Sequence, residues 1–170
     1  LFTIIGGKWT TYRRMASDVI NKMEEVLRWR SAGSLTEHMR IHGAMEVDWQ
    51  DPWYFYGTDA ANIRDLLSRN QQMKEELSGR YNIVRAQVVW AVREEMARNI
   101  EDFLARRVRL LFLDAKEALR IAPAVARIMA EELHKDEHWV ATQISSFADE
   151  AKAYLLDEDK SDAMKFTASE

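Results

Sequence analysis

The chain has 170 residues, of which 47% are hydrophobic and 31% charged, a composition typical of a folded domain and not of a disordered tail. Lys and Arg number 24 and Asp and Glu 28, so the net charge of −4 lacks the basic excess of a nucleic-acid-binding protein. The absence of Cys excludes disulfides and thiolate metal sites, and no apolar run is long enough to cross a membrane. Only 6 Gly and 2 Pro interrupt the chain, which favours long helices. Together with the helical periods described below, this predicts an all-α fold of about six helices preceded by one short strand.

The first residues differ from the rest of the chain. Residues 1–5 are apolar and partly β-branched, which predicts one short strand that leaves through the Gly6-Gly7 turn. A single strand has no sheet of its own. Residues 1–8 are therefore interpreted as the terminal strand and turn of another domain, and the chain as a piece of a larger protein.

Helical periods continue through most of the chain after this turn. An amphipathic helix is predicted over 11–29, and capping-box spacing predicts a short helix over 34–43. The remaining predicted helices cover 59–67, two parts of 83–113 that meet near 98–99, 114–121, a new helix that begins at Pro123, and 137–156. Residues 9–156 are expected to form one helical domain, and residues 157–170 a polar tail.

The irregular segment 45–57 is rich in aromatic residues. They crowd around Pro52 and are Trp49, Trp53, Tyr54, Phe55 and Tyr56. Burial preference predicts a loop that these side chains anchor to the core, while a surface that stacks on a ligand or a partner is left open.

The segment 93–107 is dense in charges of both signs. One interpretation is a solvated helix face with ion pairs three and four residues apart, each stabilising by a few tenths of a kcal/mol. Many apolar residues interrupt these charges, so a second interpretation is that some of the pairs are partly buried at a domain interface.

Two patterns suggest a metal site, but neither is supported by its context. His134 and His138 match the inverted zinc motif His-x-x-Glu-His, yet a helix end is predicted between them, so solvated helix-end residues are expected and no metal site. The acidic segment from Asp157 lacks the glycine and the glutamate that a calcium loop requires.

The Gly6-Gly7-Lys8 sequence does not have the spacing of a nucleotide-triphosphate loop. Two glycines nevertheless allow the backbone to approach a flat or charged ligand closely, and a lysine and two threonines follow at once. A ligand role and an ordinary strand-to-helix turn both stay open on these residues alone.

Three motifs together resemble one family. Residues 6–13 read Gly-Gly-Lys-Trp-Thr-Thr-Tyr-Arg, residues 56–57 read Tyr-Gly, and residues 88–114 contain Val-Arg-Glu-Glu-Met-Ala, Glu-Asp, Leu-Ala-Arg-Arg and Leu-Phe-Leu-Asp in this order. The chain resembles the C-terminal end of the FAD-dependent, membrane-associated sn-glycerol-3-phosphate dehydrogenases over nearly its whole length. Asn99 and Val108 stand where the family usually has threonine. Larger, animal-type relatives carry calcium-binding hands after this domain, and because the segment from Asp157 lacks the residues of a calcium loop, the chain resembles the bacterial type.

The resemblance implies where a cofactor binds. Gly6 and Gly7 would pack their backbone against the flavin, Lys8 would place positive charge near the flavin or the substrate phosphate, and Thr10 and Thr11 would offer hydroxyls or amides. No catalytic residue and no metal ligand is expected in the chain. The dinucleotide-binding glycine motif is missing, so the fragment alone is expected to bind no FAD and to be inactive.

The resemblance also implies the activity and partners of the whole enzyme. Such an enzyme oxidises sn-glycerol 3-phosphate to dihydroxyacetone phosphate and passes electrons through FAD to a quinone. It is cytoplasmic and peripheral to the inner face of the cell membrane, with a parent FAD-binding and substrate domain as partner of this chain and a homodimer left open. The alternative is a non-catalytic helical interaction or capping module without flavin contact.

Overall fold

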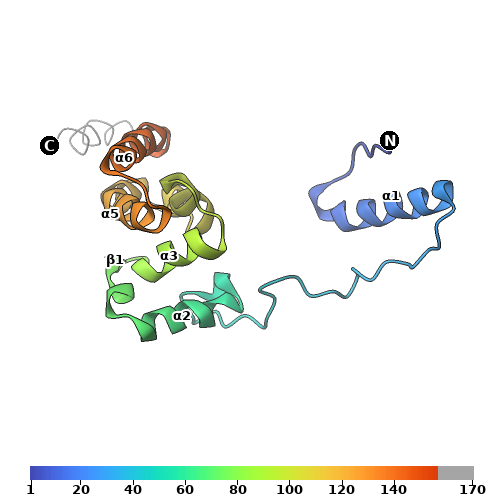
Figure 1. The fold of residues 1–170 in the computed structure, drawn as a ribbon, viewed down its shortest axis with the longest axis horizontal. Helices are drawn as coiled ribbons and strands as arrows, with labels where there is room; N and C mark the ends of the chain where they lie inside the picture. Colours follow the sequence, from blue (N-terminus) through green and yellow to red (C-terminus); the bar gives the residue numbers. More distant parts are fainter. Residues whose placement is uncertain (157–170) are drawn as a thin grey trace. The chain divides into compact units, whose positions relative to one another are not determined.

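The computed structural model describes residues 1–156 and divides the chain into two compact units, Leu1–Glu46 and Val47–Glu170. Helices dominate the described residues, whose only β-structure is a two-stranded sheet, so the predicted all-α fold is confirmed (Figure 1). The division after residue 8 stays a prediction, and the predicted tail 157–170 lies outside the described residues.

The first unit is built on one helix. A short 3₁₀ helix, η1 (Trp9–Thr11), leads directly into α1 (Tyr12–Leu27), close to the predicted range 11–29. The helix ends where Arg28 adopts a left-handed conformation with a φ of 54°. None of the residues of α1 is fully buried: Ile20 and Val26 are exposed, and Val19 is only half-buried.

Two predictions for the first unit are wrong. Residues 1–5 form no strand, because no other segment of the described chain pairs with them. Residues 34–43 form turns and no helix. The hydroxyl of Ser34 accepts the N–H of Thr36 at 3.4 Å and lies 3.0 Å from its hydroxyl, so it closes a local turn where the prediction had it cap a helix.

The second unit contains the remaining described elements. Its regular helices and strands are α2 (Asp59–Arg69), β1 (Glu76–Ser78), β2 (Ile83–Val84), α3 (Arg85–Glu94), α4 (Leu110–Leu113), α5 (Ala115–Leu133) and α6 (Glu137–Ala151). Short 3₁₀ helices lie at η2 (Tyr54–Tyr56), η3 (Gln71–Lys74) and η5 (Lys152–Tyr154), and η4 (Asp102–Arg107) is a π-helix. The antiparallel hairpin of β1 and β2 was not predicted, because its strands are short and lie in a polar region.

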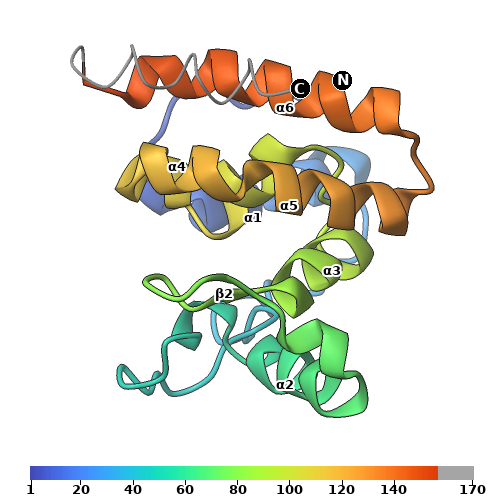
Figure 2. The ribbon, with the colours of Figure 1, turned by 90° about the vertical axis from the view of Figure 1, so that its left-hand side faces the viewer.

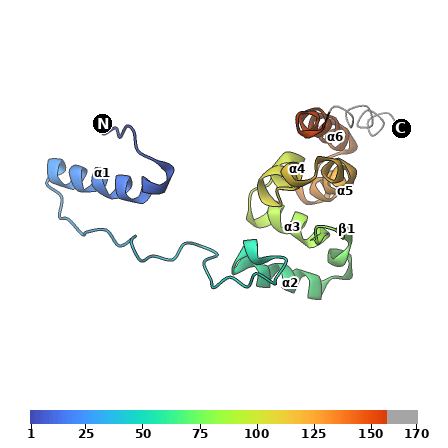
Figure 3. The same ribbon diagram turned by 180° about the vertical axis from the view of Figure 1, so that it is seen from behind.

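The core of the second unit lies around α5. Figures 2 and 3 show α6 along one side of α5 and α3 on the other, and both helices contact α5 extensively. The predicted apolar positions of the helical segments in this unit, η4 included, are largely buried, and the fully covered ones include Val88, Phe103, Leu104, Val125 and Met129. Helical periodicity therefore identified the core-facing side of these segments correctly.

Pro123 does not end a helix, contrary to the prediction of a break at this residue. It lies inside the continuous helix α5. A proline has no N–H to donate, so one hydrogen bond of the helix is lost there. Ile121, Ala122, Val125 and Ala126 around it are buried, and this packing against the neighbouring helices compensates for the lost bond.

The aromatic loop divides into anchors and exposed rings. Trp53 and Tyr56 are buried, and the indole N–H of Trp53 donates to the carbonyl of Asn82 at 3.1 Å, which ties the loop to the hairpin. The predicted anchoring is confirmed for these two residues. Trp49, Tyr54 and Phe55 remain exposed. The rings of Trp49 and Tyr54 lie 5.1 Å apart and those of Tyr54 and Phe55 5.9 Å apart.

Candidate functional site

Residues 6–11 lead into α1 and include the 3₁₀ helix η1. Gly6 and Gly7 both have positive φ values, of 90° and 98°, in the region that favours glycine. A Cβ at Gly7 would lie 2.1 Å from the sulfur of Met15, whereas a Cβ at Gly6 would meet no atom within 4 Å. The positive φ favours glycine at both positions, and a side chain at position 7 would also require the flexible end of Met15 to move. The space beside Gly6 is open.

Thr11 closes the turn on the backbone of Lys8. The N–H of Lys8 donates to Oγ1 of Thr11 at 3.1 Å, and this hydroxyl donates to the carbonyl of Lys8 at 2.9 Å. The N–H of Thr11 donates to the same carbonyl at 2.9 Å. Three hydrogen bonds therefore join two residues that are three positions apart, and the hydroxyl of Thr11 is used within the chain.

The side chains of Lys8 and Thr10 are exposed and have no polar partner within the described residues. The turn thus presents an unpaired ammonium group, a free hydroxyl and the open space beside Gly6. An ammonium group suits an anion, and a glycine backbone permits the close approach of a flat ring. The five predicted site residues are neighbours in sequence and are all exposed, and the structure separates those whose side chains have no partner in the described residues from Thr11, whose hydroxyl is used in the turn.

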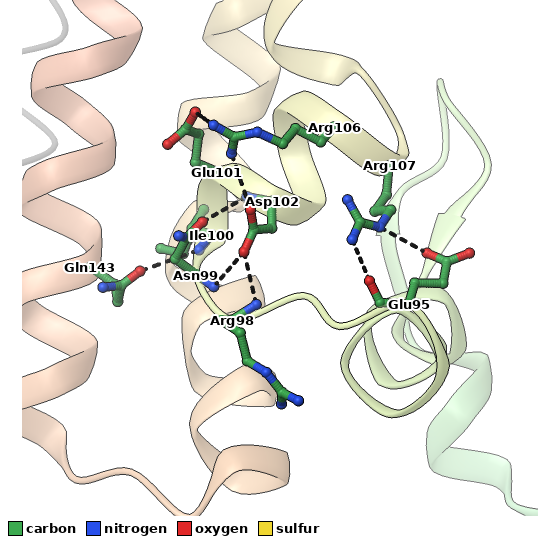
Figure 4. Close-up of polar contacts among 9 residues, drawn as sticks. All are labelled: Glu95, Arg98, Asn99, Ile100, Glu101, Asp102, Arg106, Arg107 and Gln143. Carbon is green, nitrogen blue, oxygen red and sulfur yellow. Dashed lines mark hydrogen bonds and ion pairs between the residues drawn. The ribbon is translucent and has the colours of Figure 1, made fainter. Parts of the chain in front are cut away.

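The second unit contains a network of polar contacts where α3 ends and η4 begins (Figure 4). The side chain of Asn99 accepts the N–H of Asp102 at 2.7 Å, and the carboxylate of Asp102 accepts the N–H groups of Arg98 and Asn99 at 2.9 and 3.3 Å. The side chain of Gln143 on α6 accepts the N–H of Ile100 at 3.3 Å. These bonds satisfy the N–H groups at the start of the helical segment that contains η4.

Two arginines of η4 continue this network. Arg106 pairs with Glu101 and with Asp102, at 3.1 Å in the latter case. Arg107 donates to the carbonyl of Glu95 at the end of α3, and its Nε lies 3.3 Å from Oε2 of the same residue (Figure 4). The charges of segment 93–107 thus join α3 to η4, and the interpretation as a wholly solvated face is wrong for Arg107 and Glu95, whose side chains are largely covered.

Glu95 lies in a partly buried polar cluster. Its Oε2 makes an ion pair with Arg107, but the geometry is not that of a hydrogen bond, and within residues 1–156 the buried indole N–H of Trp90 also meets no acceptor in hydrogen-bond geometry. Burial raises the pKa of the Glu95 carboxyl, and nearby Asp59 adds to the increase, while Arg107 opposes it. The charged carboxylate is therefore less stable here than in water.

Tyr56 of the Tyr-Gly motif lies close to α3, which contains the start of the motif segment 88–114. Gln87 on α3 is buried, and its amide nitrogen donates to the hydroxyl of Tyr56 at 3.3 Å. Burial raises the pKa of Tyr56, and the hydrogen bond from Gln87 opposes this, while the charge of Glu95 contributes to the increase. The predictions missed Gln87 and Trp90, because both lie in an ordinary helical period without a local motif.

The two histidines of the zinc pattern lie on different helices. His134 has a left-handed conformation at the end of α5, and His138 lies in the first turn of α6. Among residues 1–156 no group of three or more His, Cys, Asp or Glu side chains is arranged to hold a metal ion. No helix of the described chain is long and apolar enough to span a membrane.

Comparisons with known proteins agree on one family. Residues 3–140 match the family described as the C-terminal domain of alpha-glycerophosphate oxidase. A probable mitochondrial glycerol-3-phosphate dehydrogenase of Dictyostelium discoideum is 29% identical over 85% of this chain and 27% of its own length. The mitochondrial glycerol-3-phosphate dehydrogenase of Macaca fascicularis is 29% identical over 91% and 24%, and that of Saccharomyces cerevisiae is 28% identical over 81% and 27%.

The chain spans about a quarter of the length of these relatives. They are eukaryotic, so they give no support to the expected bacterial type. No solved structure matches the chain. The match over residues 3–140 includes the turn and most residues of the polar clusters and of the core, and the chain therefore belongs to the family of the C-terminal domain of alpha-glycerophosphate oxidase.

Proposed function

We propose that the chain is the C-terminal part of an FAD-dependent glycerol-3-phosphate dehydrogenase and that residues 6–11 contribute to its flavin and substrate site. The unpaired ammonium of Lys8, beside the free hydroxyl of Thr10 and the open space at Gly6, carries this proposal. Family membership and the names of the relatives support it.

The exposed groups of the turn suit a flavin and a phosphate. The backbone at Gly6 can lie against a flat ring, because no atom of the described chain fills the space where a side chain would be. Lys8 would hold positive charge against the substrate phosphate or the flavin, where exclusion of water strengthens the interaction. Bound FAD would supply the acceptor for the hydride that leaves C2 of glycerol 3-phosphate as the alcohol is oxidised to dihydroxyacetone phosphate.

The second unit would serve the enzyme as a helical cap that contacts the parent FAD-binding and substrate domain. The exposed cluster of Trp49, Tyr54 and Phe55 supports an interface role for this unit, because neighbouring exposed aromatic rings are typical of contact surfaces. If residues 6–11 do not contact the flavin and the interface role alone applies, the chain is a non-catalytic capping module.

The whole enzyme is proposed to pass electrons to a quinone and to bind the inner face of the cell membrane peripherally, from the cytoplasm. A homodimer is proposed as its assembly. Fractionation of cells that express the full-length protein, followed by light scattering of the purified enzyme, tests attachment and assembly together. Recovery from the membrane only with detergent would contradict peripheral attachment, and a monomer in solution would contradict the homodimer.

The experiment that tests the site uses the full-length protein. Lys8→Ala is expected to lower kcat/KM for glycerol 3-phosphate with a dye acceptor by about tenfold or more, the effect of removing one electrostatic group. Lys22→Ala is the matched control, since Lys22 is an exposed lysine of the same unit that pairs with Glu25 at 2.8 Å. Unchanged kcat/KM in Lys8→Ala would leave the capping role as the function of this chain.

A further inference from the structure

We infer that Thr11 is a positioning residue that fixes the backbone of Lys8, and that Thr10 is the threonine that meets the ligand. This inference rests on the proposed function, because it assigns different roles to two residues of the same proposed site. The sequence alone gives both threonines the same role, since they are adjacent and chemically identical.

Hydrogen bonds within the turn use most of the donor and acceptor capacity of the Thr11 hydroxyl. A threonine hydroxyl has one proton to donate. At 2.9 Å from the carbonyl oxygen of Lys8 and 3.5 Å from the sulfur of Met15, the hydroxyl directs this proton to the carbonyl, the stronger acceptor. One of its lone pairs accepts the N–H of Lys8. The bonding capacity of Thr11 is thus mostly used inside the turn.

These bonds hold Lys8 from both sides. Its N–H and its carbonyl group are both bound to Thr11, so the peptide units before and after the Cα of Lys8 are fixed while its side chain stays free. A lysine side chain is long and flexible, and fixing its origin limits the volume in which the ammonium group moves. Thr11 would therefore determine where the charge of Lys8 is placed in the site.

Thr10 differs from Thr11 in its contacts. It is exposed and makes no side-chain hydrogen bond within the described residues. It lies in η1, two residues after Lys8, between the residue whose charge is free and the residue that closes the turn. Its hydroxyl is the one that remains available to a phosphate or a flavin.

The test compares Thr11→Val, Thr11→Ser, Thr10→Val and Thr10→Ser in the full-length protein. Valine keeps the shape of threonine but has no hydroxyl, and serine keeps the hydroxyl. Hydrogen–deuterium exchange of the Lys8 amide, resolved by electron-transfer fragmentation in the flavin-free and flavin-loaded protein, reports the hydrogen bond itself. Bound flavin per chain, its visible spectrum, and kcat and KM for glycerol 3-phosphate report the effect on the site.

Thr11→Val is expected to accelerate exchange of the Lys8 amide about tenfold in the flavin-free protein and to lower kcat/KM about tenfold with flavin still bound. Thr11→Ser is expected to restore both, and Thr10→Val to change flavin content or KM without changing Lys8 exchange. Wild-type exchange and kcat/KM in Thr11→Val would overturn the inference. Unchanged kcat/KM in Lys8→Ala would instead overturn the proposed function, so the two failures are distinguishable.

Discussion

Glu117 provides a test of how charge stabilises the second unit. Its carboxylate accepts two hydrogen bonds from Arg120, with distances of 2.6 and 2.7 Å, and a further one from the hydroxyl of Ser78. Arg120 also donates to the carbonyl of Leu77 at 2.8 Å, so the pair joins α5 to β1. The hydrogen bonds from Arg120 are the largest cause that lowers the pKa of Glu117 from 4.5 to about 2.

This pKa predicts the effect of Glu117→Gln on stability. One pKa unit corresponds to about 1.4 kcal/mol, so the full shift sets a limit of about 3 kcal/mol. Solvent screens the partly exposed pair, and about 1–2 kcal/mol of unfolding free energy is the expected loss at pH 7. Because the pKa is lowered in the folded state, the difference between the two proteins should be complete above pH 4.5 and should disappear as the pH falls through about 2.

Urea unfolding of this chain, followed by circular dichroism between pH 7 and pH 2, measures this difference. Glu76→Gln is the matched control, because Glu76 is an exposed residue of the adjacent strand β1. The control removes one negative charge without removing the contacts of Glu117. Equal stability of Glu117→Gln and the unchanged protein at pH 7, or a difference that grows on acidification, would refute the reasoning.

Three further predictions concern the turn and the network. Gly6→Ala and Gly7→Ala should each destabilise the turn by about 1 kcal/mol through the positive φ at these positions, and Gly7→Ala should also move the flexible end of Met15; thermal melts of the full-length variants test this, and unchanged melts would contradict it. Glu95→Gln should be at least as stable as the unchanged chain at pH 7, because burial raises the pKa of Glu95; this advantage should shrink as the pH falls through the raised pKa and be gone below about 4.5, and lower stability at pH 7 would contradict this. Asn99→Ala should lose about 1 kcal/mol in urea unfolding, as expected for a removed helix cap, and no loss would exclude the capping role.

The helices of the second unit were predictable because their burial follows their period. Val88, Phe103 and Val125 recur at helical spacing and are buried, so one face of each segment indicates the core. The period is a property of several turns, and single residues do not alter it. Pro123 shows this, since tertiary packing keeps α5 continuous where local rules predict an end.

Short elements were predicted less well because their signals are local. At Ser34 the capping-box spacing is present, but the hydroxyl bonds to Thr36 and the helix does not form. The strands β1 and β2 are stabilised by pairing with each other, which no single segment reveals. The segment 1–5 has the composition of a strand, but composition does not supply a partner.

The candidate site was predictable in its residues but not in their roles. The turn sequence identified Lys8 and two threonines together, whereas the hydrogen bonds that separate Thr10 from Thr11 depend on backbone geometry. The hydrogen bond between Gln87 and Tyr56 joins residues distant in sequence. Such a contact follows from tertiary packing, and spacing along the chain does not encode it.

A structure of the full-length protein with FAD and glycerol 3-phosphate bound tests the central claim most directly. The claim predicts the ammonium group of Lys8 within about 4 Å of the flavin or the substrate phosphate, the distance of an ion pair. It also predicts the hydroxyl of Thr11 still bonded to the backbone of Lys8. A turn that faces solvent, with Lys8 distant from both molecules, would contradict the claim and leave the chain as a helical cap.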